Sequence, residues 1–579
     1  MPDILKQLGR SPYCWILFMA MLLRLPGLGW GLPASDGWDD DGVAPRNFLV
    51  GAVQTYVPGS YFTYPPLHMI LLMILTLPGW IIALAHARSF APHDVIASFI
   101  GVRYMTFFAI VARIVSVTMS LGTIYILGQM TEIVAGRRAG YFAATACSLN
   151  ATLTYYGQVT NLDGPYLFWA VLALREWMDI IAHRNVRRVR WAMFFTAAAI
   201  ATKDQAYAIF LLSVPILLII WFMTDDWPRR QARALLFSII LWGVIALIGL
   251  AMIDGAITNY SGFLKRIAFL GGPASLDYAQ YEHTTRGWYA LTQDIWSYLP
   301  RSYPTAAFGL AFIGICVHIG RFRDNRRVCV AGLLPLLAAL SFTLAFNCIA
   351  LRSENRFLLP QTVLLSVYIG IAVDRLTRQK ARWREQGSVA LTIFVFGMAL
   401  FQCLALDAEF IKDPRYDAER WMAAHVRASD TIEAIGLNVY LPRFPYDATV
   451  TRLDRKPLSQ RNPLPNVTEI EDGFDAVVVG KPKFIVVNSF WLQDYLLPKP
   501  INTEDGRIVQ KTRQSAFRDT TARHNFALLM EGKLGYTIAR TSIYESRIWP
   551  PIEGYESLAQ TVFILAACRV GLPCEGGRL

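Results

Sequence analysis

Apolar stretches of nearly 20 residues recur along the chain from the N-terminus to about residue 406, and short basic clusters separate them. A helix needs about 20 consecutive apolar residues to cross the hydrocarbon core of a bilayer. The chain is 54% hydrophobic and only 17% charged, whereas a soluble domain carries about 25% charged residues. The sequence therefore predicts a polytopic α-helical membrane protein. Because no small-residue cleavage site follows the first apolar run, we interpret that run as a retained span rather than a signal peptide.

The character of the chain changes at about residue 407. The remaining residues are mixed and polar, and they contain strand-like runs such as "DAVVVG", "KFIVVNSFW" and "TVFILAACR". Short runs of β-branched and aromatic residues of this kind are typical of strands. We predict a transmembrane domain at 1–406, in which the first outer loop and juxtamembrane helices occupy about 31–103. A small α/β domain at 407–579 follows it.

Positive charge concentrates in five loops between apolar runs: "GRRAG" (136–140), "HRNVRRVR" (183–190), "DWPRRQAR" (226–233), "RFRDNRR" (321–327) and "DRLTRQKARWRE" (374–385). Cytoplasmic loops of membrane proteins carry an excess of Lys and Arg. This rule accounts for the formal net charge of +12, so we expect no nucleic-acid partner.

If these loops and the N-terminus are all cytoplasmic, each interval between them holds an even number of spans. The outer turns then fall near Asp163, near Lys203, within 254–300 and near Arg352. This arrangement predicts about 11 transmembrane helices in the inner (cytoplasmic) membrane of a bacterium. It also places the first outer loop and the C-terminal domain on the outer, periplasmic side.

Two segments are unusual under this topology. The segment 65–86 is long enough to span, but a span there would move every later basic loop outside. We therefore predict a broken helix, interrupted by its prolines, that lies in or dips into the outer interface. The segment 191–223 must cross twice, with arms of about 15 residues that reach roughly 22 Å each. Its tip, "TKDQ", should therefore lie below the outer surface, facing a polar cavity.

Charged residues of both signs gather at the predicted outer face. They are Asp36, Asp39, Asp40, Asp41 and Arg46 in and after "SDGWDDDGVAP", Asp163 in "TNLDGPYLFW", Lys203 and Asp204 in the short hairpin, and Arg352, Glu354 and Arg356 in "LRSENRFLLP". Cations neutralise phosphate oxygens, and a carboxylate can accept the proton of a hydroxyl nucleophile. The set therefore suits transfer of a sugar from a lipid phosphate to a hydroxyl. No P-loop or dinucleotide fingerprint is present, which fits an outer face without nucleotide sugars.

Each of these residues also has a structural interpretation. The acidic loop could be a solvated surface, Asp163 could cap the helix that follows at Pro165, and Arg352 and Arg356 could anchor helix ends at the interface. Lys203 is the hardest to explain in this way, because its hairpin is short. His68, His86 and His93 lack metal-ligand spacing, and we interpret them as structural.

Several segments resemble one superfamily in order and spacing. They include "RLPGLGW", "DDDGVAP", "YFTYPPLH", "AAIATKDQAYAIFLL", "NRFLLPQTVLLSVYIGIA" and "DPRYDAERWMAAHVRASDTI". The chain resembles the GT-C-fold glycosyltransferases that use polyprenyl-phosphate sugars, among them the protein O-mannosyltransferases and lipid A aminoarabinose transferases. The resemblance covers most of the first 430 residues. It implies a GT-C fold with an outer juxtamembrane helix at the "PPL" segment.

The resemblance also implies roles for individual residues. The catalytic carboxylate maps to Asp40 with Asp41 beside it, although the adjacent Asp39 could take its place. The second carboxylate maps to Asp163. Cations near the donor phosphate map to Lys203 and Arg356, with Arg46 and Arg352 as further candidates for substrate binding. Asp41 stands where Glu is common, which leaves a divalent cation at the acidic loop open, and we favour a metal-independent reaction.

These observations predict an integral-membrane glycosyltransferase. It would move a sugar, with inversion, from a polyprenyl-phosphate donor to an acceptor glycolipid, polysaccharide or protein at the outer face of the membrane, amid membrane lipids. Two alternatives stay open. A lipid-linked sugar flippase or transporter would need polar residues along a path through the bundle, and a non-catalytic lipid-binding scaffold would not need the Asp40 and Asp163 pair.

The cysteines give a separate indication of the side on which the C-terminal domain lies. Six of the eight fall in predicted spans, whereas Cys568 and Cys574 lie near the C-terminus. A disulfide between these two could persist in an oxidising compartment. The alternative is two unpaired thiols.

Overall fold

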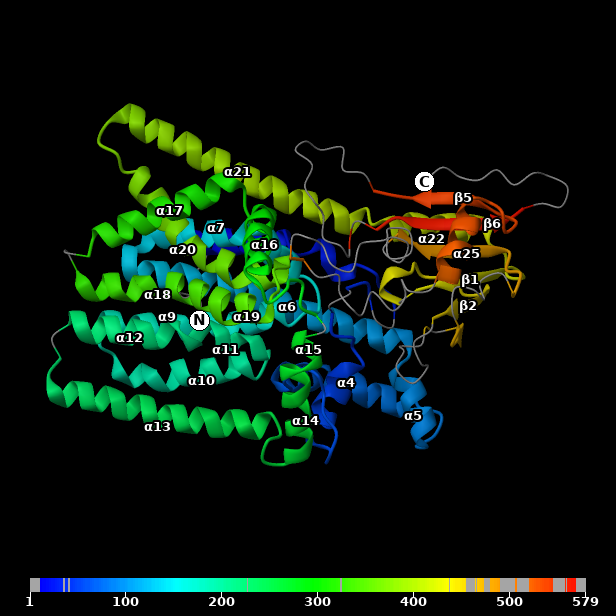
Figure 1. Ribbon diagram of the computed structural model, residues 1–579, viewed down its shortest axis with the longest axis horizontal. Helices are drawn as coiled ribbons and strands as arrows, with labels where there is room; N and C mark the ends of the chain where they lie inside the picture. Colours follow the sequence, from blue (N-terminus) through cyan, green and yellow to red (C-terminus); the bar gives the residue numbers. More distant parts are fainter. Residues whose placement is uncertain are drawn as a thin grey trace.

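The computed structural model describes residues 11–579 except 35–36, 40–41, 226, 277, 323–324, 437, 455–463, 465, 473–478, 490–505, 508–519, 545–557, 559 and 569–579. Most of the long helices lie side by side along one direction, and a β-sheet domain lies beyond one end of this bundle (Figure 1). The predicted division into a helical domain and a C-terminal α/β domain is therefore present in the fold.

The N-terminal part of the chain supplies one bundle helix, a group of helices at the sheet end, and the longest helix. Its elements are α2 (Pro12–Leu22), η1 (Pro26–Gly29), α3 (Asn47–Tyr56), α4 (Leu67–Ala85), α5 (Pro92–Phe99), α6 (Val102–Ala135), α7 (Arg137–Ser148) and α8 (Ala151–Tyr156). α6 has 34 residues and packs against α4 near its start and against α7 and α9 further along. It therefore connects the bundle with the outlying helices α3 to α5.

The middle of the chain completes the bundle. Its elements are α9 (Asp163–His183), η2 (Val186–Arg188), α10 (Val189–Ile200), η3 (Asp204–Ala206), α11 (Tyr207–Leu211), α12 (Ser213–Thr224), α13 (Arg229–Ile253), α14 (Tyr260–Gly271), α15 (Pro273–Leu276), α16 (Thr285–Tyr298), η4 (Leu299–Arg301), α17 (Thr305–Gly320), α18 (Arg326–Phe342), η5 (Thr343–Asn347), α19 (Cys348–Ala350), η6 (Asn355–Leu358), α20 (Leu359–Leu376) and α21 (Arg382–Ile411). α14 and α16 run across the bundle direction, close to its sheet end (Figure 1).

Burial separates the centre of the bundle from its edge. α20 buries almost all of its residues and packs against α7, α17 and α18. α13 is as apolar as α20, yet Leu235 is its only buried residue. A helix that is apolar all round is stable either inside a protein or against lipid. We therefore interpret α20 as the centre of the bundle and α13 as a lipid-facing helix.

Eight helices in the described part of the chain are long and apolar enough to cross a membrane, and nine if the bent pair Thr285–Arg301 and Thr305–Gly320 is one span. The sequence predicted about 11. Seven of the eight are predicted spans, whereas α4 is not, and the predicted span α17 counts only as part of the bent pair. The other predicted spans, at α7–α8, α9 and α10, do not qualify. α7 and α10 have only 12 residues each, and α9 carries charged residues along its second half.

The helix α4 differs from its prediction in one respect. Pro78 lies inside a continuous helix of 19 residues, so the prolines do not break it, and by length and composition it could cross a membrane. The helix nevertheless lies at the sheet end of the bundle, where it packs against α3, α5 and α6 (Figure 1). That location is compatible with the predicted juxtamembrane helix.

The predicted cytoplasmic loops meet one another at the opposite end of the bundle. Asp225 lies 2.8 Å from both Arg184 and Arg327, so three of the basic loops share one carboxylate. Arg138 and Arg378 both approach Asp374, at 3.7 and 2.9 Å. The bundle therefore has one end at which the basic loops are gathered, as the charge pattern predicted.

The C-terminal domain is a six-stranded mixed sheet with strand order β3-β2-β1-β4-β6-β5. The strands are β1 (Thr431–Ile435), β2 (Thr449–Leu453), β3 (Val467–Ile470), β4 (Phe484–Asn488), β5 (Tyr536–Ser542) and β6 (Val562–Ala567). β1 to β4 are parallel, and β6 is antiparallel to both of its neighbours, β4 and β5. The predicted strands "KFIVVNSFW" and "TVFILAACR" are confirmed as β4 and β6, whereas most of "DAVVVG" lies outside the described residues.

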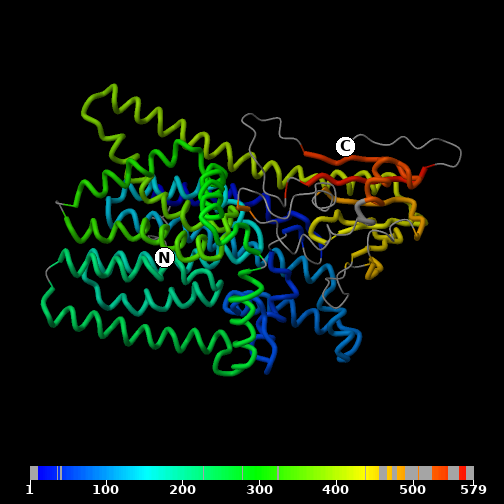
Figure 2. The backbone as a smooth tube through the Cα atoms, viewed as in Figure 1, coloured from blue at the N-terminus to red at the C-terminus, as the bar shows by residue number. Residues whose placement is uncertain are grey.

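Two helices pack on opposite faces of this sheet. α22 (Pro414–His425) covers the face that carries Ile432, and α25 (Thr520–Met530) covers the face that carries Ile435. Successive strand residues point to opposite faces, which explains why two separate apolar cores form. Figure 2 shows α21 leading out of the bundle to the domain, and the predicted boundary at 406–407 lies within the last turns of this helix.

Candidate functional site

The centre of the candidate site is a buried ion pair between two of the predicted residues. Lys203 Nζ lies 2.7 Å from Asp163 Oδ1 and 2.8 Å from Oδ2. The Asp163 side chain is fully buried and that of Lys203 is 13% exposed. Burying a carboxylate or an ammonium alone is costly, and a direct pair offsets much of that cost. The structure therefore brings together an outer turn and the hairpin tip that the sequence placed at the same face.

Local structure fixes both members of the pair. Asp163 begins α9, and its backbone N–H donates to Asn161 Oδ1 at 2.7 Å. Lys203 has extended backbone between α10 and η3, so the chain turns there and its side chain can reach α9. Gln205 Nε2 donates to Asp163 Oδ1 at 3.1 Å, and the Leu67 N–H donates to the Ala201 carbonyl. The turn "ATKDQ" is thus tied to the starts of both α9 and α4.

A second charged cluster lies immediately beside the first. Asp204 accepts a hydrogen bond from Arg266 in α14, and the Arg266 guanidinium also lies 3.6 Å from Asp254, at the end of α13. Burial raises the pKa of Asp254 to about 6, and the charge of Arg266 opposes this rise. The sequence prediction had included Asp204 but neither Arg266 nor Asp254.

The acidic loop is described only in part. Asp40 and Asp41, the predicted catalytic pair, lie outside the described residues, as does Asp36. Asp39 is 9% exposed and its Oδ1 accepts a hydrogen bond from the Tyr155 hydroxyl at 3.3 Å. The Val43 N–H donates to the Thr160 carbonyl at 2.7 Å. These contacts place the loop against the turn that leads into α9 and Asp163.

The remaining predicted cations have other surroundings. Arg356 Nε lies 3.0 Å from Glu354 Oε2, and its guanidinium stacks over Phe357. Arg352 stacks over Tyr278 and Phe357. Arg46 is half-buried, directly before α3. The part of these three residues in the site stays a prediction.

Hydrogen bonds and ring contacts hold the first outer loop against the C-terminal domain. Trp30 Nε1 donates to Asp413 Oδ2 at 2.9 Å, and Arg415 binds both oxygens of the same carboxylate. The Arg415 guanidinium also stacks on the Trp38 ring, with 4.3 Å to the centroid. The Gly31 N–H donates to the Tyr416 hydroxyl. The quoted segments "RLPGLGW" and "DPRYDAERW" therefore meet directly.

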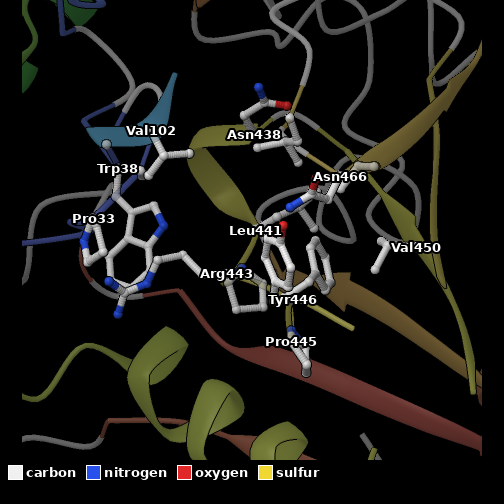
Figure 3. Close-up of a pocket in the computed structure, with 16 residues that line it drawn as sticks. Pro33, Trp38, Val102, Asn438, Leu441, Arg443, Pro445, Tyr446, Val450 and Asn466 are labelled. Atoms are coloured by element: carbon white, nitrogen blue, oxygen red, sulfur yellow. The ribbon is translucent and has the colours of Figure 1, made fainter. Parts of the chain in front are cut away.

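A cavity of about 400 Å³ opens between this loop and the domain. It is lined by Val102 at the start of α6, by a group of residues between 438 and 467, and by Pro33, Ala34, Gly37 and Trp38 (Figure 3). Among the lining residues that the structure describes, Arg443 alone is charged, and it is paired with Glu419. The volume is within the range of small-molecule pockets. The lining suits a neutral ligand with apolar faces.

Several of these residues had no distinguishing signal in the sequence. Arg266 follows Lys265, and only the helix register separates the two, because Gly262 and Arg266 are the buried residues of α14. Among the residues that the structure describes, no group of three or more His, Cys, Asp or Glu side chains could hold a metal ion. The acidic loop, where the sequence leaves a divalent cation open, belongs in part to the undescribed residues.

Comparisons with known proteins identify similar folds among solved structures. No family model matches the chain, and no curated protein matches it. ArnT from Cupriavidus metallidurans bound to undecaprenyl phosphate is 15% identical with a TM-score of 0.49, and the match covers 86% of this chain and 98% of that one. ArnT from the same organism in the apo state is 15% identical with a TM-score of 0.48, and the match covers 85% of this chain and 97% of that one. A third match is the oligosaccharyltransferase AglB from Archaeoglobus fulgidus in complex with an inhibitory peptide and a dolichol-phosphate. It is 14% identical with a TM-score of 0.44, and the match covers 93% of this chain and 80% of that one.

Proposed function

We propose that the protein is an integral-membrane glycosyltransferase that moves a sugar from a polyprenyl phosphate to an acceptor. The observation that supports this most is the buried Asp163–Lys203 pair, which lies at one end of the bundle, close to the acidic loop. A buried ion pair alone does not identify an enzyme. Its position beside a loop with three consecutive aspartates supplies both an acid–base group and a cation for one reaction.

The reaction proceeds by one displacement at the anomeric carbon. Asp40 accepts the proton of an acceptor hydroxyl, and the hydroxyl oxygen attacks the anomeric carbon from the face opposite the phosphate. The bond between this carbon and the phosphate oxygen breaks, its electron pair stays on the lipid phosphate, and the configuration inverts. Asp39 is the alternative base, and Asp41 directly follows Asp40 in sequence.

Cations stabilise the negative charge that develops on the departing phosphate. Lys203 is the first candidate, because an ammonium has three N–H donors and Asp163 orients it. Arg356 is the second, and Arg352 and Arg46 are weaker candidates. No step needs a metal ion, although a divalent cation at the acidic loop would supply the same charge stabilisation.

The topology that we propose has eleven crossings, of which α7–α8, α9 and α10 make the three that are short or carry charge. The C-terminal domain then lies on the periplasmic side of an inner membrane. The disulfide of Cys568 supports this side, because disulfides persist in oxidising compartments. Its predicted partner, Cys574, lies outside the described residues.

The cavity between the acidic loop and the C-terminal domain is the proposed site for the part of the acceptor that does not react. Trp38, in its lining, directly precedes Asp39, so an acceptor bound there would extend towards the proposed base. Figure 3 shows Pro33 and Trp38 on one side of this cavity and Leu441, Tyr446 and Asn466 on the other.

A transfer assay tests the proposal. Purified protein in lipid nanodiscs is incubated with a panel of polyprenyl-phosphate sugars and a panel of acceptor glycolipids, polysaccharides and proteins. Mass spectrometry then identifies any glycosylated product and the released polyprenyl phosphate. We expect product formation with one donor, and its loss in Asp40→Asn. Movement of intact donor across a vesicle membrane, with no glycosylated product, would instead establish the transporter.

A further inference from the structure

The side chain of Arg266, in α14, is almost completely buried in the second ionic cluster. Its side chain is 3% exposed, that of its partner Asp204 is 30% exposed, and that of Asp254 is 8% exposed. Two of its guanidinium nitrogens, Nε and Nη1, are buried without a hydrogen-bond partner. A guanidinium is held in such a place at a considerable desolvation cost. The burial of Arg266 beside Asp204 therefore needs an explanation.

The helix that carries Arg266 is fixed independently of this contact. Asn259, which caps α14, donates to the carbonyls of Thr55 and Ser60 at 3.0 and 2.7 Å. It also accepts the N–H of Gly59 at 2.9 Å. The side-chain amide thus binds α14 to the end of α3. Arg266 lies about two turns further along α14, so it projects from a rigid support rather than from a free loop.

Asp204 directly follows Lys203 in the turn between α10 and α11. The backbone of Lys203 is extended, with φ −153° and ψ 124°, so consecutive side chains there point in opposite directions. Lys203 reaches Asp163 on one side, and Asp204 reaches Arg266 on the other. A contact that fixes Asp204 therefore also fixes the direction of the Lys203 side chain.

We propose that Arg266 is a positioning residue for Lys203, which it controls through Asp204. The role that this gives to Lys203 in donor binding rests on the proposed function, whereas the positioning itself does not. Asp254 completes the arrangement, because its carboxylate neutralises the guanidinium from the second side at 3.6 Å. Backbone bonds hold the turn itself, because the Lys203 N–H donates to the Ala199 carbonyl at 3.1 Å and the Ala206 N–H donates to the Lys203 carbonyl at 3.0 Å. Arg266 adds a side-chain contact to Asp204 from a separate helix.

The first test does not require enzymatic activity. Acylation of Lys203 by an amine-reactive ester is followed by peptide mass spectrometry on the intact, nanodisc-embedded protein. We expect Arg266→Met to increase the rate of Lys203 acylation at least fivefold, because the ion pair with Asp163 is loosened. Lys265→Met is the matched control, since Lys265 is exposed and donates to the Gly59 carbonyl at 2.8 Å. It should leave the rate unchanged. Equal rates in Arg266→Met and wild type would overturn the proposal.

Three further variants separate positioning from loss of folding. Asp204→Asn weakens the same contact from its more exposed side, and it should also accelerate acylation. The double variant with Arg266→Met should be no faster than Arg266→Met alone, because both changes remove one interaction. Arg266→Lys retains the charge and should restore part of the protection. Additive effects of the two changes would mean that Arg266 does not act through Asp204.

The second test is kinetic. Arg266→Met should raise the donor KM about tenfold or more and change the acceptor KM little, with partial recovery in Arg266→Lys and none of these effects in Lys265→Met. Equal increases in both KM values would indicate a general structural defect and contradict the proposal. If wild-type protein transfers no sugar, the proposed function fails, and the acylation rates still decide whether Arg266 positions Lys203.

Discussion

Neither Lys203 nor Asp163 can be replaced alone without leaving a buried charge, because the Asp163 side chain is fully buried. Removing one partner of a buried pair typically costs about 3–5 kcal/mol of unfolding free energy. A single substitution therefore mixes loss of stability with loss of function. The double variant Lys203→Met/Asp163→Asn keeps the site neutral and tests the role of the charges more directly.

We expect Lys203→Ala to raise the donor KM more than Lys265→Ala, because Lys203 would contact the donor phosphate and Lys265 is exposed. The neutral double variant should fold nearly as well as the wild type and keep the high donor KM. Steady-state kinetics with varied donor, combined with thermal unfolding, gives both quantities. The same donor KM in Lys203→Ala and Lys265→Ala would remove Lys203 from the donor site.

The acidic loop gives a second prediction. Asp40→Asn should reduce transfer by about 100- to 10,000-fold, the usual contribution of a general base, while donor binding and folding are retained. Donor binding is measured separately with labelled polyprenyl-phosphate sugar. Asp39→Asn is the matched neighbour and should be milder, since Asp39 is buried against Tyr155. If only Asp39→Asn is inactive, the base is Asp39.

Glu433 in β1 carries a pH-dependent contribution to the stability of the C-terminal domain. It is 5% exposed, and burial raises its pKa from 4.5 to about 8. Between pH 4.5 and 8 the folded domain retains a proton that the unfolded chain releases, so the unfolding free energy falls as pH rises through this window. We expect Glu433→Gln to be about 1–3 kcal/mol more stable than wild type at pH 8 and similar at pH 4.5. Urea unfolding of the domain, followed by limited proteolysis at both pH values, measures this. An equal difference at the two pH values would contradict it.

The sequence predicted which charged residues gather at one face but not which of them pair. Charge in the loops fixes the side of each turn, so Asp163, Lys203 and Asp204 could be assigned to one surface before any fold was known. Which turns contact one another depends on how the helices pack, and this packing cannot be read from the sequence alone. Arg266 was missed for this reason, because nothing in "FLKRIAF" separates a buried arginine from an exposed lysine without the packing of α14.

Among the elements, the predictions were most accurate where one physical rule dominates. β4 and β6 follow from dense β-branched runs, and the long apolar helices follow from the thickness of the bilayer. The number of spans was harder to predict, because α10 has only 12 residues and α9 carries charges. Pro78 was expected to break α4, yet a proline can remain inside a helix when surrounding structure supports it.

The segment Leu441–Tyr446 forms part of the cavity lining and makes the acceptor site testable. Tyr446 is 84% exposed, so Tyr446→Ala should leave the fold intact. We expect a five- to tenfold increase in the acceptor KM and no change in the donor KM, about 1–1.4 kcal/mol of lost contact. Tyr289→Ala is the control, since Tyr289 is exposed in α16, outside the cavity. An unchanged acceptor KM in Tyr446→Ala would exclude the cavity as the acceptor site.

For the complete chain, the main question is the side of the membrane on which the sheet domain lies. Cys568 is disulfide-bonded, whereas the six cysteines from Cys14 to Cys403 are in the thiol form. We expect alkylation of the denatured, unreduced protein to modify these six and to leave the C-terminal pair unmodified until reduction. Cys568→Ser should release one further reactive thiol, at Cys574. Two modified cysteines in the unreduced C-terminal peptide would exclude the bridge and remove its support for a periplasmic domain.

The acidic loop is held at two places that belong to different parts of the protein. Trp38 is stacked under Arg415 of α22, and Val43 is hydrogen-bonded to Thr160 before α9. The segment between Trp38 and Val43 must therefore be long enough to connect these two attachment points. Replacing one aspartate by another residue changes the chemistry of this segment, whereas inserting even one glycine changes its length. In related sequences, the number of residues between Trp38 and Val43 should therefore be conserved more strictly than the identity of the residues that flank the aspartates.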